Sequence, residues 1–347
     1  TQYSLISLSE TICIIAAGGI QKTFVNPMID RSHRWVRWAR GYQKLSKHLA
    51  FLDYPFQRYL HTKARESIPA IFVVGAPRSG STLAYQALHT GLKSFYLSNL
   101  WNMLYATPAL GGMISSSLCR NHSSHFRSAR GLTGGLCGEA EGMRFWEHWT
   151  GQGLKEEPQA LDPRNTRKIA RIITSLGKRT MPFISGYLGH AFSMQHLRNF
   201  FPGALFVHVT RALTPNACSV FTISPHEWFS LLPKALKDIN TLDRKQMICR
   251  QLLNIHRTIL ENSNAEDTFI MPYEGLCKNP AGMIQQFIHF VSQKKSFELQ
   301  PQCQKLPGRF HISSPPQNAL YREFNSYMAE AVKQQDQYSS FFQNLLE

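Results

Sequence analysis

A glycine-rich stretch early in the chain has residue types and spacing suited to binding an anion. Gly75 and Gly80 match the pattern G-x-x-x-x-G, and Thr82 stands where that pattern has Ser or Thr. In such a loop the backbone N–H groups lead into a helix N-terminus and offer partial positive charge to one anion. We therefore interpret V-G-A-P-R-S-G-S-T-L, residues 74–83, as an anion-binding loop.

Residue 81 separates two kinds of ligand for this loop. The loop of a nucleoside triphosphatase has a lysine there, which reaches the β- and γ-phosphates, and Ser81 cannot do this. The cation stands instead at Arg78, inside the loop and after the stiffening Pro77. A loop that keeps the anion cradle and moves its cation is suited to an anion other than a triphosphate.

A second cationic position follows an apolar run at residues 204–210, which ends at Arg211. If a helix begins near Thr214, Ser219 lies about one and a half turns into it, and its hydroxyl can face Arg211. Arginine gives a forked, permanently charged contact to a phosphate, and serine adds a neutral donor. Arg211 and Ser219 are therefore candidates for a second anion contact.

Both motifs resemble those of the sulfotransferase family. The segment P-R-S-G-S-T-L is similar to the family's donor loop, P-[KR]-[ST]-G-[ST]-T, and the spacing from Arg211 to Ser219 is similar to its 3′-phosphate motif. The chain departs from the family after Arg211, where it reads R-A-L-T-P in place of R-x-P. The resemblance implies that 3′-phosphoadenosine 5′-phosphosulfate (PAPS) is the donor and PAP the product. Its 5′-phosphosulfate would be held by Arg78, Ser79, Gly80, Ser81 and Thr82, and its 3′-phosphate by Arg211 and Ser219.

Two later segments extend the resemblance, which covers roughly residues 68–291. The segment Y-E-G-L-C-K-N-P, residues 273–280, is similar to a shared strand-to-helix turn, and we expect its role to be structural. In K-L-P-G-R, Lys305, Gly308 and Arg309 could close over the 3′-phosphate, as basic residues with a glycine do in many relatives. A solvated loop is the alternative for this segment.

Sulfuryl transfer is an in-line displacement at sulfur, so it needs a base for the acceptor proton and cations for the departing phosphate. Glu139 and Glu141 precede an aromatic segment, residues 145–149, where partial burial would raise a carboxyl pKa toward neutrality. Glu141 best matches the Glu of an E-x-x-x-F-W segment in some bacterial sulfotransferases. His190 lies near the place where the cytosolic members have their catalytic His. We favour Glu141 as the base, with Glu139 and His190 as alternatives; no metal is required, and no motif indicates one.

The elements that must position these residues alternate along the chain. This alternation predicts an α/β fold of the P-loop-like, three-layer type, with a central parallel sheet flanked by helices and ligands at the carboxyl ends of the strands. Apolar, β-branched runs predict strands, and amphipathic patterns predict helices. The expected strands are residues 70–74, 204–210 and 268–271, and the expected helices are residues 81–91, 164–178, 192–200, 214–221, 242–261 and 281–291.

We divide the chain into three parts. Residues 1–66 form a helical N-terminal extension, residues 67–295 form the core, and residues 296–347 form a loop and a helix that complete the donor site. A helix expected from Asp30 to about residue 50 has aromatic residues on one side and basic residues on the other. We expect it to pack on the core; peripheral contact with an anionic membrane through residues 30–50 is the alternative.

Composition restricts the class of protein. Hydrophobic residues make up 43% of the 347 residues, enough for a large core, and the net charge of +16 implies an anionic partner. A nucleotide with several phosphates meets this requirement, and no nucleic-acid-binding signature is present. The seven cysteines form no C-x-x-C pair, so we expect reduced thiols with neither a zinc site nor a disulfide framework. No apolar run reaches the length of a membrane span, and we expect a cytoplasmic enzyme.

The sequence thus predicts a sulfotransferase that moves the sulfuryl group of PAPS to a hydroxyl, or as second choice an amine, of a small-molecule acceptor. A small-molecule kinase on the same scaffold is the alternative enzyme, although it would need a loop lysine and a magnesium-holding Asp. A nucleotide- or polyanion-binding protein without turnover is the other alternative. The sequence does not specify the oligomeric state. It leaves open whether the following aromatic residues line an acceptor pocket or belong to the core: Phe95, Tyr96, Trp101, Tyr105 and Trp146.

Overall fold

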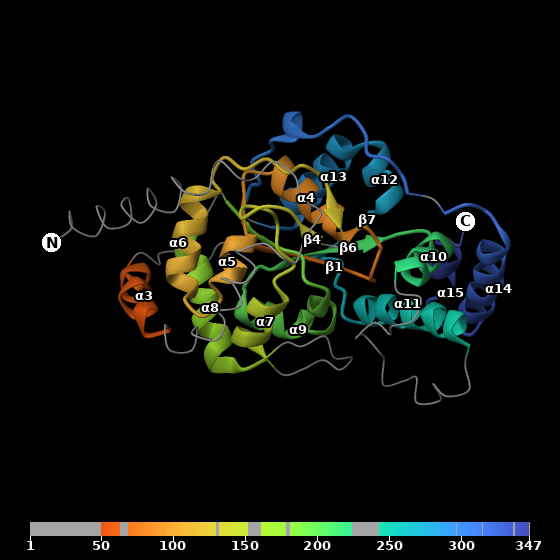
Figure 1. Cartoon of the computed structure of the whole chain (residues 1–347), viewed down its shortest axis with the longest axis horizontal. Helices are drawn as coiled ribbons and strands as arrows, with labels where there is room; N and C mark the ends of the chain where they lie inside the picture. Colours follow the sequence, from red (N-terminus) through yellow and green to blue (C-terminus); the bar gives the residue numbers. More distant parts are fainter. Residues whose placement is uncertain are drawn as a thin grey trace, which may run out of the picture.

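A parallel five-stranded sheet lies at the centre of the computed structural model (Figure 1). The structure describes residues 50–62, 69–129, 132–151, 161–177, 181–223, 243–295, 297–313, 315–335 and 337–346. In spatial order the strands are β2 (Phe95–Tyr96), β5 (Phe183–Ser185), β1 (Ala70–Gly75), β6 (Leu205–Thr210) and β7 (Thr268–Pro272). The predicted α/β fold with a central parallel sheet is confirmed.

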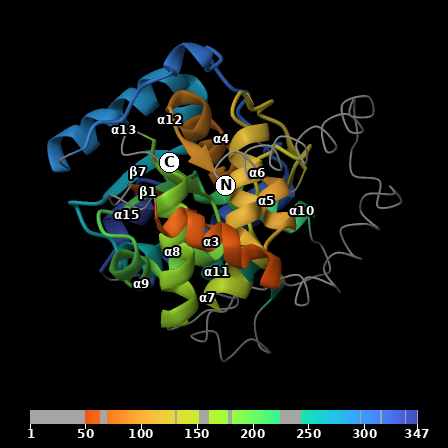
Figure 2. The ribbon, with the colours of Figure 1, turned by 90° about the vertical axis from the view of Figure 1, so that its left-hand side faces the viewer.

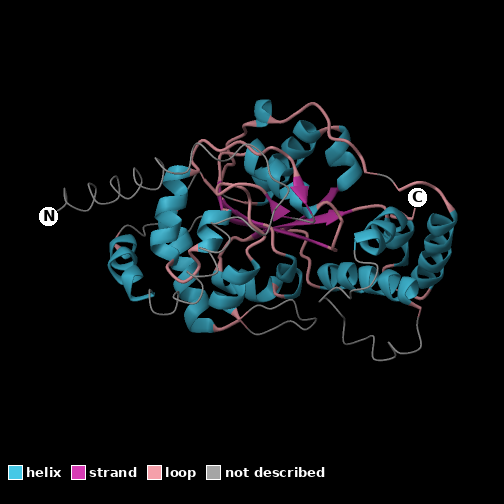
Figure 3. Ribbon diagram, viewed as in Figure 1, coloured by secondary structure: helices cyan, strands magenta, loops and turns pink. Residues whose placement is uncertain are grey.

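Helices cover both faces of this sheet, as Figure 3 shows. Successive side chains of β1 point to opposite faces, because a strand has a period of two residues. Ile71 and Val73 join one buried cluster with side chains of α4 (Ser81–Gly91), α12 (Tyr273–Lys278) and α13 (Pro280–Lys294). Phe72 and Val74 join a second cluster on the other face, with side chains of α8 (Pro163–Leu176), α9 (Met194–Phe200) and α11 (Arg244–Glu261). The molecule therefore has three layers, as the sequence predicts.

Two further groups of helices lie at opposite ends of the sheet. Near the C-terminus, α10 (Leu213–Ile223), α14 (Ala319–Lys333) and α15 (Ser339–Gln343) pack together with α11 (Figure 1). At the other end, η1 (Ala50–Asp53) and α3 (Tyr54–His61) pack on α6 (Pro108–Leu118), and α3 also packs on α8 (Figure 2). The remaining short elements are α5 (Asn99–Met103), α7 (Met143–Thr150), η2 (Leu188–Phe192), η5 (Cys303–Lys305) and an antiparallel pair, β3 (Ser128–Ala129) with β4 (Leu132–Thr133).

The expected elements of the core are present, with ends that shift by at most three residues. The sequence does not predict β2 and β5, since runs of two and three residues are too short to show a period. The aromatic residues considered for an acceptor pocket pack in the core: Phe95, Tyr96, Trp101 and Trp146 are buried, and Tyr105 is partly buried against the cluster that contains Phe95, Trp101 and Trp146. The helix expected between Asp30 and residue 50 lies outside the described residues.

The expectation that every cysteine is a reduced thiol is wrong for one pair. Cys119 and Cys137 form a disulfide, with a Cα–Cα distance of 5.2 Å. They are separated by 18 residues and belong to no local motif, so only the fold shows that they meet. Among the other described cysteines, Cys218, Cys249 and Cys277 are buried free thiols and Cys303 is a partly exposed one. No described helix has the length and apolar character needed to cross a membrane.

Candidate functional site

The carboxyl ends of four neighbouring strands meet at one edge of the sheet. The loop after β1 carries Arg78, Arg211 follows β6 directly, Tyr273 follows β7, and Tyr187 lies two residues after β5. In open parallel sheets this edge is where ligands bind. The predicted loop and the predicted Arg211 therefore lie together at the expected place.

The loop between β1 and α4 requires both of its glycines. A Cβ at Gly75 would lie 2.9 Å from the Val209 carbonyl oxygen of the neighbouring strand. Gly80 has a φ of 93°, and a Cβ there would lie 2.3 Å from a ring carbon of Tyr273. Arg78 itself has a φ of 65°, which is uncommon for a residue with a side chain and turns the chain into the N-terminus of α4. The tight turn directs the first N–H groups of α4 toward the open edge of the sheet.

Asn216, on α10, holds this loop by hydrogen bonds to its backbone. Oriented to satisfy its neighbours, its amide nitrogen donates to the carbonyl oxygens of Pro77, at 2.9 Å, and Arg78, at 3.2 Å. Asn216 is fully buried and was not among the predicted site residues. Its position in N-A-C-S-V-F gives no signal of this role, because the contact joins residues far apart in the chain.

Two guanidinium groups converge beside the loop. Arg78 Nε donates to Ser219 Oγ at 3.3 Å. Arg211 Nη1 donates to the Arg78 carbonyl oxygen at 2.9 Å, and its Nη2 donates to the Ser313 carbonyl oxygen. The Arg211 guanidinium also lies over the ring of Tyr273, at 4.7 Å from the centroid. Ser219 thus meets the loop arginine rather than the strand-end arginine, and the last part of the chain reaches the site through Ser313.

This part of the site is strongly electropositive. Burial lowers the pKa of Arg78, and the nearby positive charge of Arg211 lowers it further. Ser79 Oγ and Arg211 Nε are buried and have no hydrogen-bond partner among the described residues. Ser81 and Thr82 are half-buried in the first turn of α4. Two cations, unused donors and a helix N-terminus are the donor set that a phosphate or sulfate group requires.

The Glu141 carboxyl lies close enough to Arg78 for the two charges to interact. It is half-buried, and burial raises its pKa to about 7, although the charge of Arg78 acts in the opposite direction. Its charge also contributes to the raised pKa of Tyr187, at the end of β5. Gly142, with a φ of 75°, turns the chain from Glu141 into α7. The structure therefore brings Glu141 close to the loop, with a pKa suited to proton transfer at neutral pH.

The other two candidate bases lie deeper in the molecule. Glu139 is 2% exposed and accepts a hydrogen bond from Gln86, on the second turn of α4, at 3.4 Å. His190 is fully buried; its Nε2 pairs with Ser185 Oγ at 3.0 Å, and its ring packs edge-on against Phe72 at 4.8 Å. Burial lowers the His190 pKa to about 3. Neither residue is brought to the loop as Glu141 is.

Arg309 is exposed, and no contact joins it to Arg78 or Arg211 within the described residues. Lys305 donates instead to Gln302, at 2.6 Å.

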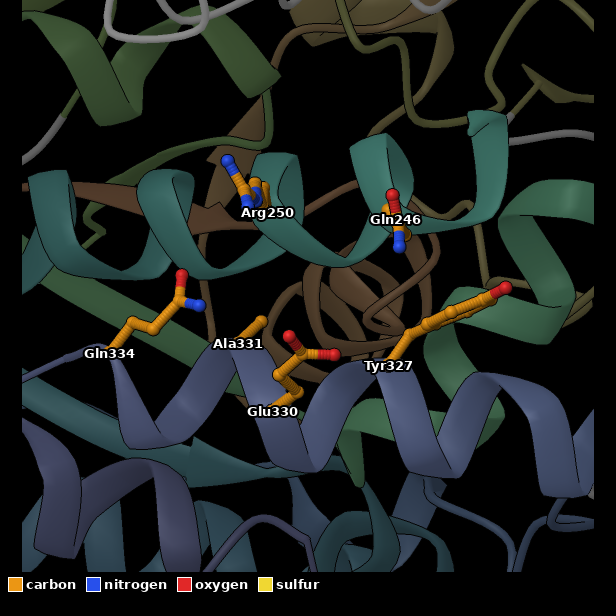
Figure 4. Close-up of a pocket in the computed structure, with 6 residues that line it drawn as sticks. All are labelled: Gln246, Arg250, Tyr327, Glu330, Ala331 and Gln334. Carbon is orange, nitrogen blue, oxygen red and sulfur yellow. The ribbon is translucent and has the colours of Figure 1, made fainter. Parts of the chain in front are cut away.

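A separate polar depression lies between α11 and α14, away from the loop (Figure 4). Its lining side chains are Gln246, Arg250, Tyr327, Glu330, Ala331 and Gln334. In the described part of the chain, no group of three or more His, Cys, Asp or Glu residues could hold a metal ion.

A comparison with protein-family models assigns this arrangement to a known class. The model of the Sulfotransferase family matches residues 69–295, which is more than half of the chain. The chain belongs to the sulfotransferase family. The matched region of this sulfotransferase runs from β1 through α13 and contains every predicted site residue except those of the segment with Lys305, Gly308 and Arg309.

Solved structures of bacterial sulfotransferases are similar to this sulfotransferase at low identity. STF9 from Mycobacterium avium is 16% identical, with a TM-score of 0.44, over 85% of this chain and 74% of that one. STF1 from Mycobacterium tuberculosis is 15% identical, with a TM-score of 0.43, over 83% and 78%. A sulfotransferase from Alicyclobacillus acidocaldarius is 13% identical, with a TM-score of 0.42, over 81% and 96%. The search of curated proteins finds no match.

Proposed function

We propose that this sulfotransferase moves the sulfuryl group of PAPS to a hydroxyl group of a small-molecule acceptor, with an amine as the second choice of acceptor. The proposal depends on one observation above all. Arg78 and Arg211 converge on the N-terminus of α4, and Glu141, whose pKa is about 7, lies next to Arg78. The two arginines are thus suited to a multiply charged donor, and Glu141 is suited to an acceptor that loses a proton.

The donor contacts follow from the groups at the loop. The N–H groups of the first turn of α4, the hydroxyls of Ser79, Ser81 and Thr82, and the Arg78 guanidinium would hold the 5′-phosphosulfate. Arg211 and Ser219 would hold the 3′-phosphate. Arg211 now donates to two carbonyl oxygens, so a phosphate would have to compete with the Ser313 carbonyl for its Nη2. The unpartnered Ser79 Oγ and Arg211 Nε are the donors that such an anion would satisfy.

On the acceptor side, Glu141 takes the proton of the attacking hydroxyl. Bound PAPS supplies the activated sulfuryl group, and Arg78 stabilises the negative charge that develops on the departing phosphate. The position of Glu141 beside Arg78 lets one residue receive the proton while its neighbour balances charge. We propose that no metal is needed, since the two arginines carry the positive charge for this step; turnover in the presence of EDTA tests this.

Calorimetry with PAP and ATP tests the choice of nucleotide. We expect PAP to bind in EDTA, and ATP with Mg²⁺ to bind weakly or not at all. A preference for ATP with Mg²⁺ would indicate a kinase instead. Turnover is then measured with radiolabelled PAPS on a panel of phenols, alcohols, sugars and amines. Tight PAP binding without transfer to any acceptor would favour a nucleotide-binding protein without turnover.

Partners and location are separate proposals. We propose no nucleic-acid partner, and peripheral membrane contact through residues 30–50 as the alternative to packing of that segment on the core. The sequence favours a cytoplasmic location, whereas the Cys119–Cys137 disulfide is typical of oxidising compartments. Trapping of thiols in intact cells, followed by mass spectrometry of the two cysteines, distinguishes the two compartments.

A further inference from the structure

The disulfide lies on the segment that leads to the Glu141 carboxylate. Cys119 directly follows α6, and Cys137 stands four residues before Glu141. Even a fully extended chain spans no more than about 14 Å over four residues, so the covalent link is close to the proposed base. Its other end is fixed in the fold, because Cys119 is only 5% exposed.

Residues 137–140 are held on one side by the chain that follows β2. Asn99 N donates to the Gly138 carbonyl oxygen at 2.9 Å, and Ala140 N donates to the Leu97 carbonyl oxygen at 2.8 Å. The Tyr96 hydroxyl donates to the Cys137 carbonyl oxygen at 2.6 Å. These contacts fix the segment relative to the edge of the sheet.

The disulfide fixes the same segment on its other side, to the end of α6. Between the two cysteines, residues 120–136 contain only the short β3 and β4 pair as regular structure among their described residues. The Asn99 amide nitrogen donates to the carbonyl oxygens of Thr133, at 3.0 Å, and Gly135, at 2.8 Å. Both contacts are with the later half of residues 120–136. The disulfide is therefore the covalent link that limits how far the end of α6 and residues 137–141 can separate.

The cross-link also organises the contacts around Glu139. His122, three residues after Cys119, places its Nε2 3.9 Å from Glu139 Oε1. Gln86, on α4, donates to the other carboxylate oxygen at 3.4 Å. The chain that follows α6 and Cys119, the segment before Glu141 and α4 therefore meet at the Glu139 carboxylate. A change in the position of this segment would be transmitted to Glu141 over two residues.

We propose that the Cys119–Cys137 disulfide positions the Glu141 carboxylate for proton transfer from the acceptor, so that full activity requires the oxidised form. This inference depends on the proposed function, since it concerns the base of that reaction. Cys119 and Cys137 are positioning residues, because they act through residues 138–141. The donor loop is held separately, by β1, α10 and Tyr273.

The test compares wild-type protein with the C119S/C137S double variant. We expect PAP to bind the two proteins equally, and kcat with saturating PAPS and acceptor to fall roughly tenfold to a hundredfold in the variant, as for a misplaced catalytic group. The acidic limb of the kcat profile should also move, because the surroundings of Glu141 change. Equal kcat and an unchanged limb would overturn the proposal, even if the variant melts at a lower temperature.

Reduction of the folded wild-type protein gives a second measurement that does not depend on refolding of a variant. Dithiothreitol supplies two electrons and two protons, leaves Cys119 and Cys137 as thiols and closes into its own cyclic disulfide. Reduced wild type should lose the same activity as the double variant, while circular dichroism shows retained structure. The reductant should not affect the double variant itself. Loss of activity on reduction in both proteins would contradict the proposal, because it would point to another thiol.

A matched control is C303S, which removes a partly exposed thiol whose sulfur lies 3.9 Å from the Gly91 carbonyl oxygen, at the far end of α4. We expect its kcat and pH profile to equal those of wild type. The proposed function fails separately, if oxidised wild-type protein neither binds PAP nor turns over PAPS. Mass spectrometry of the native protein that finds Cys119 and Cys137 unlinked would overturn the inference about the disulfide alone.

Discussion

At the scale of single residues, the site is organised around Arg78. Its backbone carbonyl oxygen accepts from Arg211, its side chain donates to Ser219, and its charge acts on Glu141. Its left-handed φ allows the loop to turn into α4 while the side chain remains at the edge of the sheet. One residue thereby connects Arg211 and Ser219 with Glu141.

Removal of the Glu141 carboxylate should separate binding from turnover. We expect Glu141→Gln to bind PAP as wild type does and to lose roughly a hundredfold or more in kcat, the contribution of a positioned base. Single-turnover transfer from radiolabelled PAPS is the measurement. Glu139→Gln is the matched control, since Glu139 lies against Gln86 and away from Arg78; a larger loss in this control than in Glu141→Gln would move the base assignment to Glu139.

The pH dependence of turnover follows from the same carboxyl. Its pKa of about 7 lies above the ordinary value of 4.5, so Glu141 is protonated, and inactive as a base, below neutrality. We expect kcat to fall with a slope of one log unit per pH unit below about pH 7 and to level off above it. The limb should be absent from the residual activity of Glu141→Gln. A wild-type profile that is flat from pH 5 to pH 8 would contradict the assignment.

That raised pKa also affects stability. The folded protein holds the Glu141 proton up to about pH 7, whereas the unfolded chain releases it near 4.5. The free energy of unfolding therefore decreases as the pH rises between these two values and is not recovered above them. Glu141→Gln should remove this decrease, so that at pH 8 the variant is at least as stable as wild type toward urea. The same variant thus controls for loss of activity through unfolding.

Both arginines should be needed for the nucleotide. We expect Arg78→Ala and Arg211→Ala each to weaken PAP binding by about 2–4 kcal/mol or more, because each removes a charged donor to a buried phosphate. Isothermal calorimetry measures the change. Arg309→Ala is the comparison, since Arg309 is exposed and has no contact with either arginine in the described structure; an equal loss of binding in this variant would place the tail over the 3′-phosphate.

At the scale of elements, the donor site depends on how closely the loop after β1 approaches α12. Gly80 lies against the Tyr273 ring, at the start of α12, and Tyr273 also lies under the Arg211 guanidinium. A side chain at position 80 would thus displace the loop, the ring or both. The sequence predicts a structural turn at Tyr273, and its contact with Arg211 means that this turn also orients a candidate site residue.

Gly80→Ala should therefore disturb binding as well as folding. We expect PAP affinity to fall at least about tenfold, because the new methyl group would lie 2.3 Å from a ring carbon of Tyr273 and either the loop or the ring would have to shift. Gly203→Ala is the matched control: its φ of 78° is similarly unfavourable, but its Cβ would meet nothing within 4 Å. It should lose about 1–2 kcal/mol of stability and keep its PAP affinity. Equal binding in both variants would contradict the argument.

The sequence predicted β1, its loop and α4 well because their signals are local. An apolar β-branched strand, two glycines at fixed spacing and a helix that ends at glycine lie within one short stretch, residues 70–91. The support from Asn216 and Ser313 was not predicted, since these contacts join residues more than 100 positions apart or come from irregular chain. The Cys119–Cys137 bond was missed for the same reason: the fold, rather than a motif, brings the two sulfur atoms together.

At the scale of the whole molecule, the site joins the sheet, α10 and the chain after η5. The sheet supplies the loop and Arg211, α10 supplies Asn216 and Ser219, and the chain after η5 contributes the Ser313 carbonyl. A ligand that bridges these contacts should stabilise the fold as a unit. The two arginines at this edge contribute to the net charge of +16 and are suited to a specific anionic ligand.

PAP should accordingly raise the resistance of the protein to unfolding. At a free PAP concentration of about one hundred times its Kd, binding to the folded state alone adds about 2.7 kcal/mol to the free energy of unfolding. Urea titration with and without PAP measures this gain. The Arg78→Ala variant should show no such gain in stability at the same PAP concentration. AMP, which lacks the 3′-phosphate of PAP, should stabilise the wild-type protein less than PAP does. Equal stabilisation by AMP and PAP would show that Arg211 and Ser219 hold no phosphate.

The pair of arginines at the end of the sheet has a kinetic consequence. If Arg78 and Arg211 hold PAPS as proposed, PAP keeps both contacts after transfer, because it retains its 3′-phosphate and its 5′-phosphate has gained negative charge. Transfer would therefore not weaken nucleotide binding, and release of PAP would be the slow step of the cycle. The enzyme would then complete its first turnover quickly and pause before the second.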